Sequence, residues 1–408
     1  MTPVWHSHSD YKALKKESYM EPYKEIHLVD FPKNTTIMLE HNFRKKFVRD
    51  FIDSSSSWRK AVEYLNGKSG RYNIKTKIGV GSLSHWFYGV EKTRGKTRRM
   101  PLWTIIEISK KTNVSLEDVE NNLVEICTTG RGTPIKVKFP LYLTPELVSI
   151  AFHLFGDGHL AGKGQQSHYR QVNQDGLNNF KQKLLNCFGE FDVSIFEGSK
   201  VAIPRAISSF LDEYLNLGDC YWNKSQVNDK IKNMPQDFLL AGLNAFIIDE
   251  GHIGESIEIY SSNKNLLDDI VEIINKLGYI SYGPKTKKER DGISYRAYIS
   301  LKSAKQYYSD ILKLEKKFPA CGLAQKEKLL KQIVKRQTRS WKTRAKGKTK
   351  RLILRLLSKS DLNSQELQHQ LNICGSTLRE HLQKLENDCR VTKTRLPHTH
   401  CFLWSKVK

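Results

Sequence analysis

The sequence predicts an α+β protein with a pseudo-twofold core of two similar halves between two helical domains. Three observations support this fold class. Residues 140–337 contain the same motif twice with the same order of elements after it, residues 41–127 have a helical pattern, and residues 351–408 have the pattern of three helices followed by a hairpin. At roughly 100–200 residues per domain, a chain of 408 residues is long enough for several domains.

The composition excludes several classes of protein. Hydrophobic residues make up 39% of the chain, which is enough to build packed cores. No apolar run approaches the ~18 residues of a membrane span, and Met1–Asp10 contains no apolar stretch of a secretory signal. The seven cysteines are scattered, with no C-x-x-C pair, which favours reduced thiols over disulfides or a zinc site. We therefore expect a cytoplasmic protein that does not enter a membrane.

The charge of the chain predicts a polyanionic partner. Lysine and arginine number 67 against 43 aspartates and glutamates, which gives a net charge of +24. Nucleic acid is the usual partner of so basic a protein. We expect double-stranded DNA, with RNA as a further possibility, and an association with the nucleoid.

The N-terminal part has two segments of different character. Residues 1–40 are irregular and receive no assignment. From residue 41 to 127 the pattern is helical, and a crowded basic stretch, Lys92–Arg99, follows the short predicted helix Leu83–Tyr88. Further helices are predicted to begin at Trp58, Trp103 and Ser115. The pattern is similar to the small helix-turn-helix domains of the Cro and repressor type, with Leu83–Tyr88 as the candidate reading helix, and a plain helical bundle is the alternative.

The C-terminal part has a more specific order of elements. Residues 338–350 form a basic linker, which is either solvated or in contact with phosphates. Residues 351–408 then have three predicted helices, of which the last is Ser376–Glu386, and two strands on either side of Pro397. This order is typical of a winged helix-turn-helix, with Ser376–Glu386 as its reading helix.

The central part carries the repeated motif. Each copy is an apolar helix that begins at or near a proline, Pro145 in the first and Pro235 in the second. Each copy ends with an acid directly before a Gly-His pair, and this acid is Asp157 in the first and Glu250 in the second. Strand, helix, two strands and helix are predicted after each copy. Two such units in one chain imply two half-domains related by a pseudo-twofold axis.

These segments resemble the two motifs of the LAGLIDADG homing endonuclease family. In the second copy the matching residues are Ala241-Gly242-Leu243 and Asp249-Glu250-Gly251, and the first copy ends with the common G-D-G as Gly156-Asp157-Gly158. Ile231-Lys232-Asn233-Met234-Pro235 is similar to the K-x-I-P element of the family. The resemblance covers residues 140–337, about half of the chain. It implies a saddle of two half-domains with the motif helices packed together at its centre.

The resemblance also implies a catalytic site. Small residues would let the two motif helices approach closely, so that Asp157 and Glu250 meet at the pseudo-twofold axis. Paired carboxylates there can hold Mg²⁺ or another divalent cation for phosphodiester hydrolysis. Lys232 is the expected lysine of the first half, and Lys326, with Lys328 near it, is its expected counterpart. The alternative is that each acid is a solvated turn residue without a catalytic role.

Two polar segments are the expected DNA-reading surfaces. Glutamine and arginine can make bidentate contacts to adenine and guanine edges, and lysines can contact phosphates. A solvated edge strand is the alternative for each. The expected residues are Gln165, Gln166, His168, Arg170 and Gln171 in the first half and Lys285, Lys287, Lys288 and Arg290 in the second.

The sequence thus predicts a monomeric, Mg²⁺-dependent DNA endonuclease that makes site-specific double-strand breaks. The chain begins Met1-Thr2-Pro3 and ends Ser405-Lys406-Val407-Lys408, without the ends of an intein, so we expect a freestanding enzyme of the intron-homing kind. Two alternatives remain open. One is a sequence-specific transcription regulator on the same scaffold without cleavage, and the other is an RNA-splicing helper.

Overall fold

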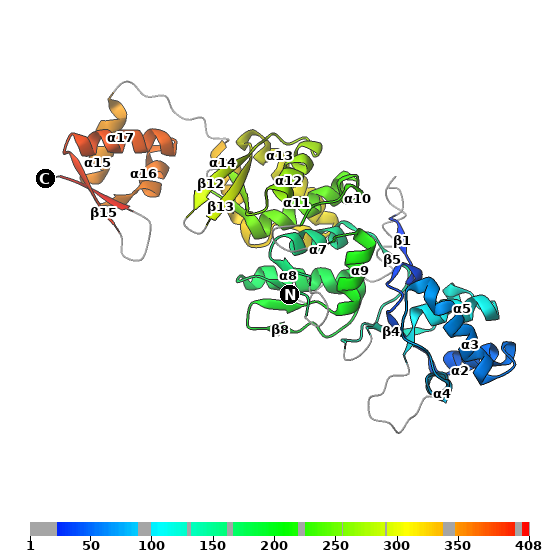
Figure 1. Cartoon of the computed structure of the whole chain (residues 1–408). Coiled ribbons are helices and arrows are strands. Elements are labelled where there is room, and N and C mark those ends of the chain that lie inside the picture. Colours follow the sequence, from blue (N-terminus) through cyan, green and yellow to red (C-terminus); the bar gives the residue numbers. More distant parts are fainter. Residues whose placement is uncertain are drawn as a thin grey trace. The chain divides into compact units, whose positions relative to one another are not determined.

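The structure, a computed structural model, divides into two compact units, Met1–Val334 and Lys335–Lys408. Figure 1 shows the elements of each. The structure describes residues 23–88, 99–128, 132–160, 166–218, 225–254, 256–289, 292–337, 347–395 and 402–407. Within these residues no helix is both long enough and apolar enough to cross a membrane.

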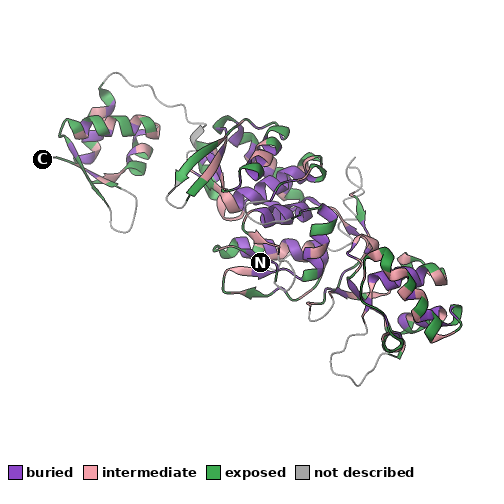
Figure 2. Ribbon diagram, in the orientation of Figure 1, coloured by how far each residue is buried: buried purple, intermediate pink, exposed green. Residues whose placement is uncertain are grey.

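The two motif helices lie against each other at the centre of the first unit. They are α7, Pro145–Phe155, and α11, Gln236–Glu250. Thr144 caps α7 by accepting a hydrogen bond from the Leu147 amide, and every residue of α7 is buried. A helix that is apolar on all sides must be buried on all sides, and both helices are among the most buried segments of the unit (Figure 2).

The two half-domains have the same strand order, which confirms the α+β class and the predicted repeat. In each four-stranded antiparallel sheet the strand that follows the motif helix lies at one edge, and the other three follow in the order second, fourth, third. The strands of the first half are β6 Gly158–His159, β7 His168–Arg170, β8 Ile195–Phe196 and β9 Lys200–Ala202. Those of the second half are β10 Gly251–Ile253, β11 Ile257–Ser261, β12 Ser281–Glu289 and β13 Gly292–Ile299.

Helices pack on one face of each sheet and, among the described elements, leave the other face open. In the second half, Ile257, Ile259, Ala297 and Ile299 alternate along β11 and β13 and are all buried. The helices of the first half are α8 Gln174–Phe188 and α9 Arg205–Leu215. The second half contains α10 Asp229–Lys232, α12 Lys264–Lys276, α13 Leu301–Lys317, η3 Pro319–Cys321, η4 Ala324–Lys326 and α14 Glu327–Gln337.

The N-terminal segment is helical, as predicted, but it also contains strands that the sequence pattern did not indicate. Ser57 and Ser115 cap two of its helices, in agreement with the capping signals. Its helices are α2 His41–Ser54, α3 Trp58–Lys68, η2 Ser69–Tyr72, α4 Val80–Tyr88, α5 Leu102–Thr112 and α6 Leu116–Asn121. Its other elements are β1 Glu25–Ile26, η1 Leu28–Asp30, β2 Thr36–Leu39, β3 Met100–Pro101 and β4 Leu123–Cys127.

The N-terminal segment shares its hydrophobic core with the first half-domain. Strand β1 pairs with β5, Leu141–Tyr142, immediately before α7. The ring of Phe31 stacks on Phe210 of α9 with a centroid distance of 4.3 Å, and it also meets Phe139 edge-on. One continuous cluster of buried apolar residues therefore runs from Ile26 to Ile333.

The second unit has a separate hydrophobic core of its own. Three helices are followed by two strands, the order that the sequence predicted, and a short additional strand joins them in a sheet of order β14-β16-β15. Asn363 and Glu366 form a capping box at the second helix. The elements are α15 Lys348–Leu357, β14 Leu362–Asn363, α16 Ser364–Leu371, α17 Gly375–Asn387, β15 Val391–Arg395 and β16 Phe402–Lys406.

Candidate active site at the ends of the paired helices

The two predicted acids occupy equivalent junctions between a motif helix and the strand that follows it. Asp157 lies just beyond the end of α7, and Glu250 is the last residue of α11. A Cβ on Gly158 would lie 2.4 Å from the Leu154 Cα, and one on Gly251 would lie 2.4 Å from the Ile247 carbonyl oxygen. Only glycine lets the chain turn back so tightly, which explains why a glycine follows each acid.

Desolvation and the charges of neighbouring acids raise the pKa of both Asp157 and Glu250. Burial is the larger cause for Asp157, with a further contribution from the charge of Asp249, and together they raise its pKa to about 7. Burial, followed by the charges of Asp157 and Asp249, raises the pKa of Glu250 to about 7. A like charge at close range disfavours ionisation of a carboxyl group, and a nearby cation favours it. The two half-domains therefore bring their acids to one electronegative place.

Lys326 is the lysine that lies with these acids. Its ammonium group donates hydrogen bonds to the carbonyl oxygens of Ile247, at 2.6 Å, and of Gly251, at the end of α11. Burial lowers its pKa, while the charges of Asp249, Asp157 and Glu250 act in the opposite direction. A cation at a helix C-terminus satisfies carbonyls that lack a partner within the helix.

Asn244 forms hydrogen bonds to the segment that leads to Lys326. Its side-chain amide donates to the carbonyls of Cys321, at 2.8 Å, and Gly322, at 2.9 Å. Its amide oxygen accepts a hydrogen bond of 2.8 Å from the buried Tyr307 hydroxyl. These three hydrogen bonds pair the polar atoms of the buried Asn244 side chain.

Lys232 is not brought to the acids. Its ammonium lies 2.6 Å from Asp269 and 3.0 Å from Glu272, both on α12. Among the residues that the structure describes, these two carboxylates are its ion-pair partners, and they raise its pKa. The lysine expected from the K-x-I-P element therefore joins α10 to α12, and Lys328 is exposed on α14.

The donor chemistry of the site fits a hard divalent cation held jointly with a substrate. Within the described ranges, no group of three or more His, Cys, Asp or Glu is arranged as a metal cage. Magnesium, however, is commonly held by one or two carboxylates, and its other ligands are water and phosphate oxygens. Asp157 and Glu250 supply such a pair, one from each half.

The first-half strand turns two of the predicted DNA-reading residues to one side. Exposure alternates along it: Ser167 and Tyr169 are buried, while Gln166 and Arg170 are exposed and His168 is half-buried. Residues two apart share a face of a strand, so His168 and Arg170 lie on the open face of β7, and the exposed Gln166 lies just before this strand begins.

The structure gives Gln171 a different place from these three residues. Gln171 accepts hydrogen bonds from the amides of Val172, at 2.9 Å, and Asn173, at 3.4 Å. Its side-chain oxygen thus closes the turn that leads into α8. Gln165 lies outside the described residues.

The second-half hairpin gathers cations and aromatic rings on its open face. Lys285 is opposite Arg296, and Lys287 is opposite Ser294, so both lysines share this face. The Lys287 ammonium lies 5.4 Å from the ring centre of Tyr260 on β11, and the Arg296 guanidinium lies 4.6 Å from that of Tyr298.

The remaining second-half residues are placed differently. Lys288 is exposed but alternates to the other face, and Arg290 lies outside the described residues. Sequence reasoning missed Arg296, Tyr260 and Tyr298. Their spacing along β13 and β11 is the signal that would have found them, because Tyr260, Arg296 and Tyr298 occupy alternate positions from the buried Ile257, Ile259, Ala297 and Ile299.

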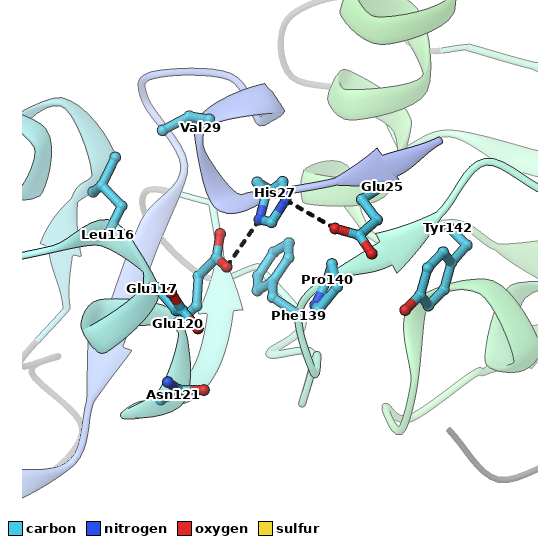
Figure 3. Close-up of a pocket in the computed structure, with 10 residues that line it drawn as sticks. All are labelled: Glu25, His27, Val29, Leu116, Glu117, Glu120, Asn121, Phe139, Pro140 and Tyr142. Atoms are coloured by element: carbon cyan, nitrogen blue, oxygen red, sulfur yellow. Dashed lines mark hydrogen bonds and ion pairs between the residues drawn. The ribbon is translucent and has the colours of Figure 1, made fainter. Parts of the chain in front are cut away.

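A cavity of about 540 Å³ lies beside the N-terminal strand β1 and is chemically unlike the helix-end site (Figure 3). His27 joins two of its acids, with Nδ1 3.1 Å from Glu120 and Nε2 3.6 Å from Glu25. Glu117 also lines it, beside the apolar rings of Phe139 and Pro140. A wall with three glutamates does not suit a phosphate ligand.

Comparisons with known proteins give one kind of match. Neither a family model nor a curated protein sequence matches this chain. Several solved structures do. A mesophilic variant of the homing endonuclease I-DmoI is 15% identical, with 41% of this chain and 97% of that chain covered and a TM-score of 0.31. I-DmoI in complex with DNA and Mn is 18% identical over 38% of this chain and 92% of that chain, with a TM-score of 0.28. A glycine-to-serine variant of I-DmoI in complex with its target DNA and Mg is 17% identical over 39% of this chain and 93% of that chain, with a TM-score of 0.28. Each of these matches covers about two fifths of this chain.

Proposed function

We propose that this protein is a site-specific DNA endonuclease that makes double-strand breaks in the presence of Mg²⁺ or another divalent cation. The observation that carries the proposal is the pair of acids, Asp157 and Glu250, at equivalent helix ends of two half-domains with the same strand order. A pseudo-twofold pair of acids matches the pseudo-twofold symmetry of the two strands of a DNA duplex.

Each residue of the site has a role in this proposal. Asp157 and Glu250 would hold the cation, and a bound cation would supply a polarised water and stabilisation of the leaving oxygen. Lys326 offsets the negative charge that gathers at the scissile phosphate. Its place at the end of α11, hydrogen-bonded to two carbonyls, keeps that charge fixed beside Glu250.

The open faces of the two sheets supply the DNA contacts. Arg170 in the first half, and Lys285 and Lys287 in the second, lie on faces that none of the described helices covers, and the exposed Gln166 lies just before β7. Arginine and glutamine suit base edges, and the lysines suit phosphates.

The flanking parts of the chain add contacts to the same DNA. At the end of α4, the candidate reading helix, Tyr88 is 62% exposed. Lys45 and Arg49 lie over the neighbouring ring of Phe87, at 5.9 Å and 5.5 Å from its centre. From Lys335 to the end, the sequence has 18 lysines and arginines against 5 acids, which is +13 of the total +24. That charge density favours phosphate contacts by the winged-helix-like unit.

The test is cleavage of DNA by the full chain. A plasmid library with a randomised insert is incubated with Mg²⁺, and the linear products are recovered and sequenced. The proposal predicts a discrete recovered site. It also predicts that Asp157→Asn and Glu250→Gln abolish cleavage while they retain binding in a mobility-shift assay. Asp192→Asn, which replaces an exposed loop acid, is the matched control and should cut at the wild-type rate.

A transcription regulator on the same scaffold is the second candidate, and the basic flanking parts favour it. Such a protein would bind a recovered DNA sequence equally well with Mg²⁺ and with a chelator, and it would leave every plasmid supercoiled. An RNA-splicing helper would instead bind a structured intron RNA more tightly than any duplex DNA in the library. Cleavage at a single site contradicts both.

A further inference from the structure

A chain of buried polar side chains crosses the junction between the two half-domains. Lys183 of α8 lies 2.8 Å from Nε2 of His153 on α7, and Nδ1 of the same ring lies 2.8 Å from Asp249 on α11. The Tyr169 hydroxyl of β7 donates to the other oxygen of Asp249 at 2.6 Å. All four side chains are 1% exposed or less. Three of the residues belong to the first half, and Asp249 belongs to the second.

Each hydrogen bond in this network of four side chains has a defined donor and acceptor. The Lys183 ammonium has only donors, so Nε2 of His153 accepts. Burial and the charge of Lys183 hold the pKa of His153 well below its ordinary value, which favours the neutral ring. A neutral ring whose Nε2 accepts a hydrogen bond carries its proton on Nδ1. Nδ1 therefore donates to Asp249, which also accepts from Tyr169. Asp249 is the common acceptor of donors from α7 and β7.

The two motif helices, both fully described, do not repeat this arrangement. The position equivalent to Asp249 in the first motif is Gly156, and that equivalent to His153 in the second is Phe246. A Cβ on Gly156 would lie 2.9 Å from the Asp249 Cβ and 3.0 Å from its carboxylate oxygen. The glycine of one motif helix thus makes room for the aspartate of the other.

Both ends of the network are next to the proposed metal-binding acids. Asp249 immediately precedes Glu250. Tyr169 is paired with Gly158, the residue after Asp157, and the next residue, Arg170, donates its amide to the Asp157 carbonyl at 3.0 Å. The hydrogen bond from Tyr169 to Asp249 therefore joins the backbone that carries one acid to the backbone that carries the other.

We infer that Lys183, His153, Asp249 and Tyr169 are positioning residues that fix the separation of the Asp157 and Glu250 carboxylates. The inference rests on the proposed nuclease function. With the separation fixed, both strands are cut in one binding event. When Tyr169 no longer holds Asp249, the two acids move independently, and the second strand is cut more slowly than the first.

The test compares two tyrosines in the full chain. Tyr169→Phe removes only the hydroxyl that donates to Asp249. Tyr279→Phe is the matched control, because the Tyr279 ring is also buried and its hydroxyl donates to an aspartate, Asp310, at 3.0 Å on the outer helix α13. The substrate is a supercoiled plasmid that carries one site recovered from the randomised library, and nicked and linear products are followed with time.

The inference predicts that nicked plasmid accumulates only with Tyr169→Phe. The rate of the second cut should fall by about tenfold relative to the first, which corresponds to the loss of one hydrogen bond. Affinity for the uncut plasmid site should be unchanged. Asp249→Ala should increase the nicked fraction further, and Asp249→Asn, which keeps an acceptor for Tyr169, should recover part of the second-strand rate.

Two outcomes would overturn the ideas separately. If the wild-type protein cuts no plasmid, the proposed function fails. If the wild type cuts, but Tyr169→Phe and Tyr279→Phe give the same ratio of nicked to linear plasmid, only the positioning role fails. A second measurement does not depend on cleavage. In protein labelled with ¹⁵N-histidine, the His153 resonances, assigned by their loss in His153→Gln, should show a neutral ring with its proton on Nδ1. A charged ring, or a proton on Nε2, contradicts the hydrogen-bond direction.

Discussion

The packing of the two motif helices can be measured with a single methyl group at Gly242. In Gly242→Ala the new Cβ would lie 2.4 Å, 2.5 Å and 2.9 Å from three ring carbons of Phe152. Carbon atoms pack at about 3.5–4.0 Å, so the ring or the helix must move by about 1 Å. Phe152 is completely buried and meets Phe155 edge-on at 5.7 Å, so its ring has no free space to enter.

The expected change in stability follows from two opposing effects. Overpacking of a filled core costs about 1–3 kcal/mol, while alanine is better than glycine inside a helix by about 1 kcal/mol. We expect Gly242→Ala to lower the free energy of unfolding by about 1–2 kcal/mol. Gly67→Ala is the matched control, because Gly67 lies in α3 and a methyl group added there would meet no heavy atom within 4 Å among the described residues. It should raise stability by up to about 1 kcal/mol.

Urea titrations followed by far-UV circular dichroism would measure both changes. At equal slope, a lower midpoint reports lower stability. The same substitution should therefore move the midpoint down at Gly242 and up at Gly67. A Gly242→Ala midpoint at or above that of the wild type would refute the close approach of α7 and α11. It would also remove the packing reason for the glycine in the motif.

Three further predictions concern Lys326 and Lys232, His27 in the N-terminal segment, and the C-terminal unit. Lys326→Met should slow single-turnover cleavage by a factor on the order of 10²–10³. Lys232→Met should cut at the wild-type rate, because Lys232 pairs with carboxylates of α12. Equal effects of the two substitutions would contradict the assignment of Lys326 as the lysine of the site. The hydrogen bond with Glu120 raises the pKa of His27. The protonated His27 therefore stabilises the folded protein below the unfolded pKa of about 6.5, and this stabilisation is lost as the pH rises through the folded pKa. His27→Gln should accordingly lower the urea midpoint at pH 6 and leave it unchanged at pH 9, and a constant difference would show that the effect is not ionic. Removal of the chain from residue 341 onward should flatten the dependence of DNA affinity on salt by about 0.9 in logarithmic slope per lost phosphate contact, and an unchanged slope in filter-binding measurements would show that this unit does not contact phosphates.

The sequence could predict those parts of the candidate site that are encoded locally. Asp157 and Glu250 could be found because each stands at the end of an apolar helix and before a glycine, and because the motif occurs twice. The same holds for the order of strands and helices along the chain, since the repeat of these elements lies within each half.

The parts that depend on distant contacts could not be found in the same way. The spacing before the second motif indicated Lys232, but α12 supplies carboxylates that hold this lysine elsewhere. Asp249 stands beside the predicted acid, yet its partners His153 and Tyr169 are 96 and 80 positions away in the sequence. Strand β1 pairs with β5, and most of the N-terminal segment lies between them in the sequence. A strand of two residues without a local hairpin has no sequence pattern that would predict it.

The continuous core between the N-terminal segment and the first half-domain has a consequence for how this protein can be recombined. Phe31 and Phe210 cover each other, so a chimera that joins a foreign N-terminal segment at residue 140 would leave Phe210 facing water. A donor segment would have to bring its own aromatic residue to the same place. The unit from Lys335 onward has a complete core of its own and can be exchanged as a cassette. Grafting is therefore unequal at the two ends of the chain: the C-terminal module can be replaced by cutting and joining, whereas the N-terminal module must be redesigned together with the surface on which it rests.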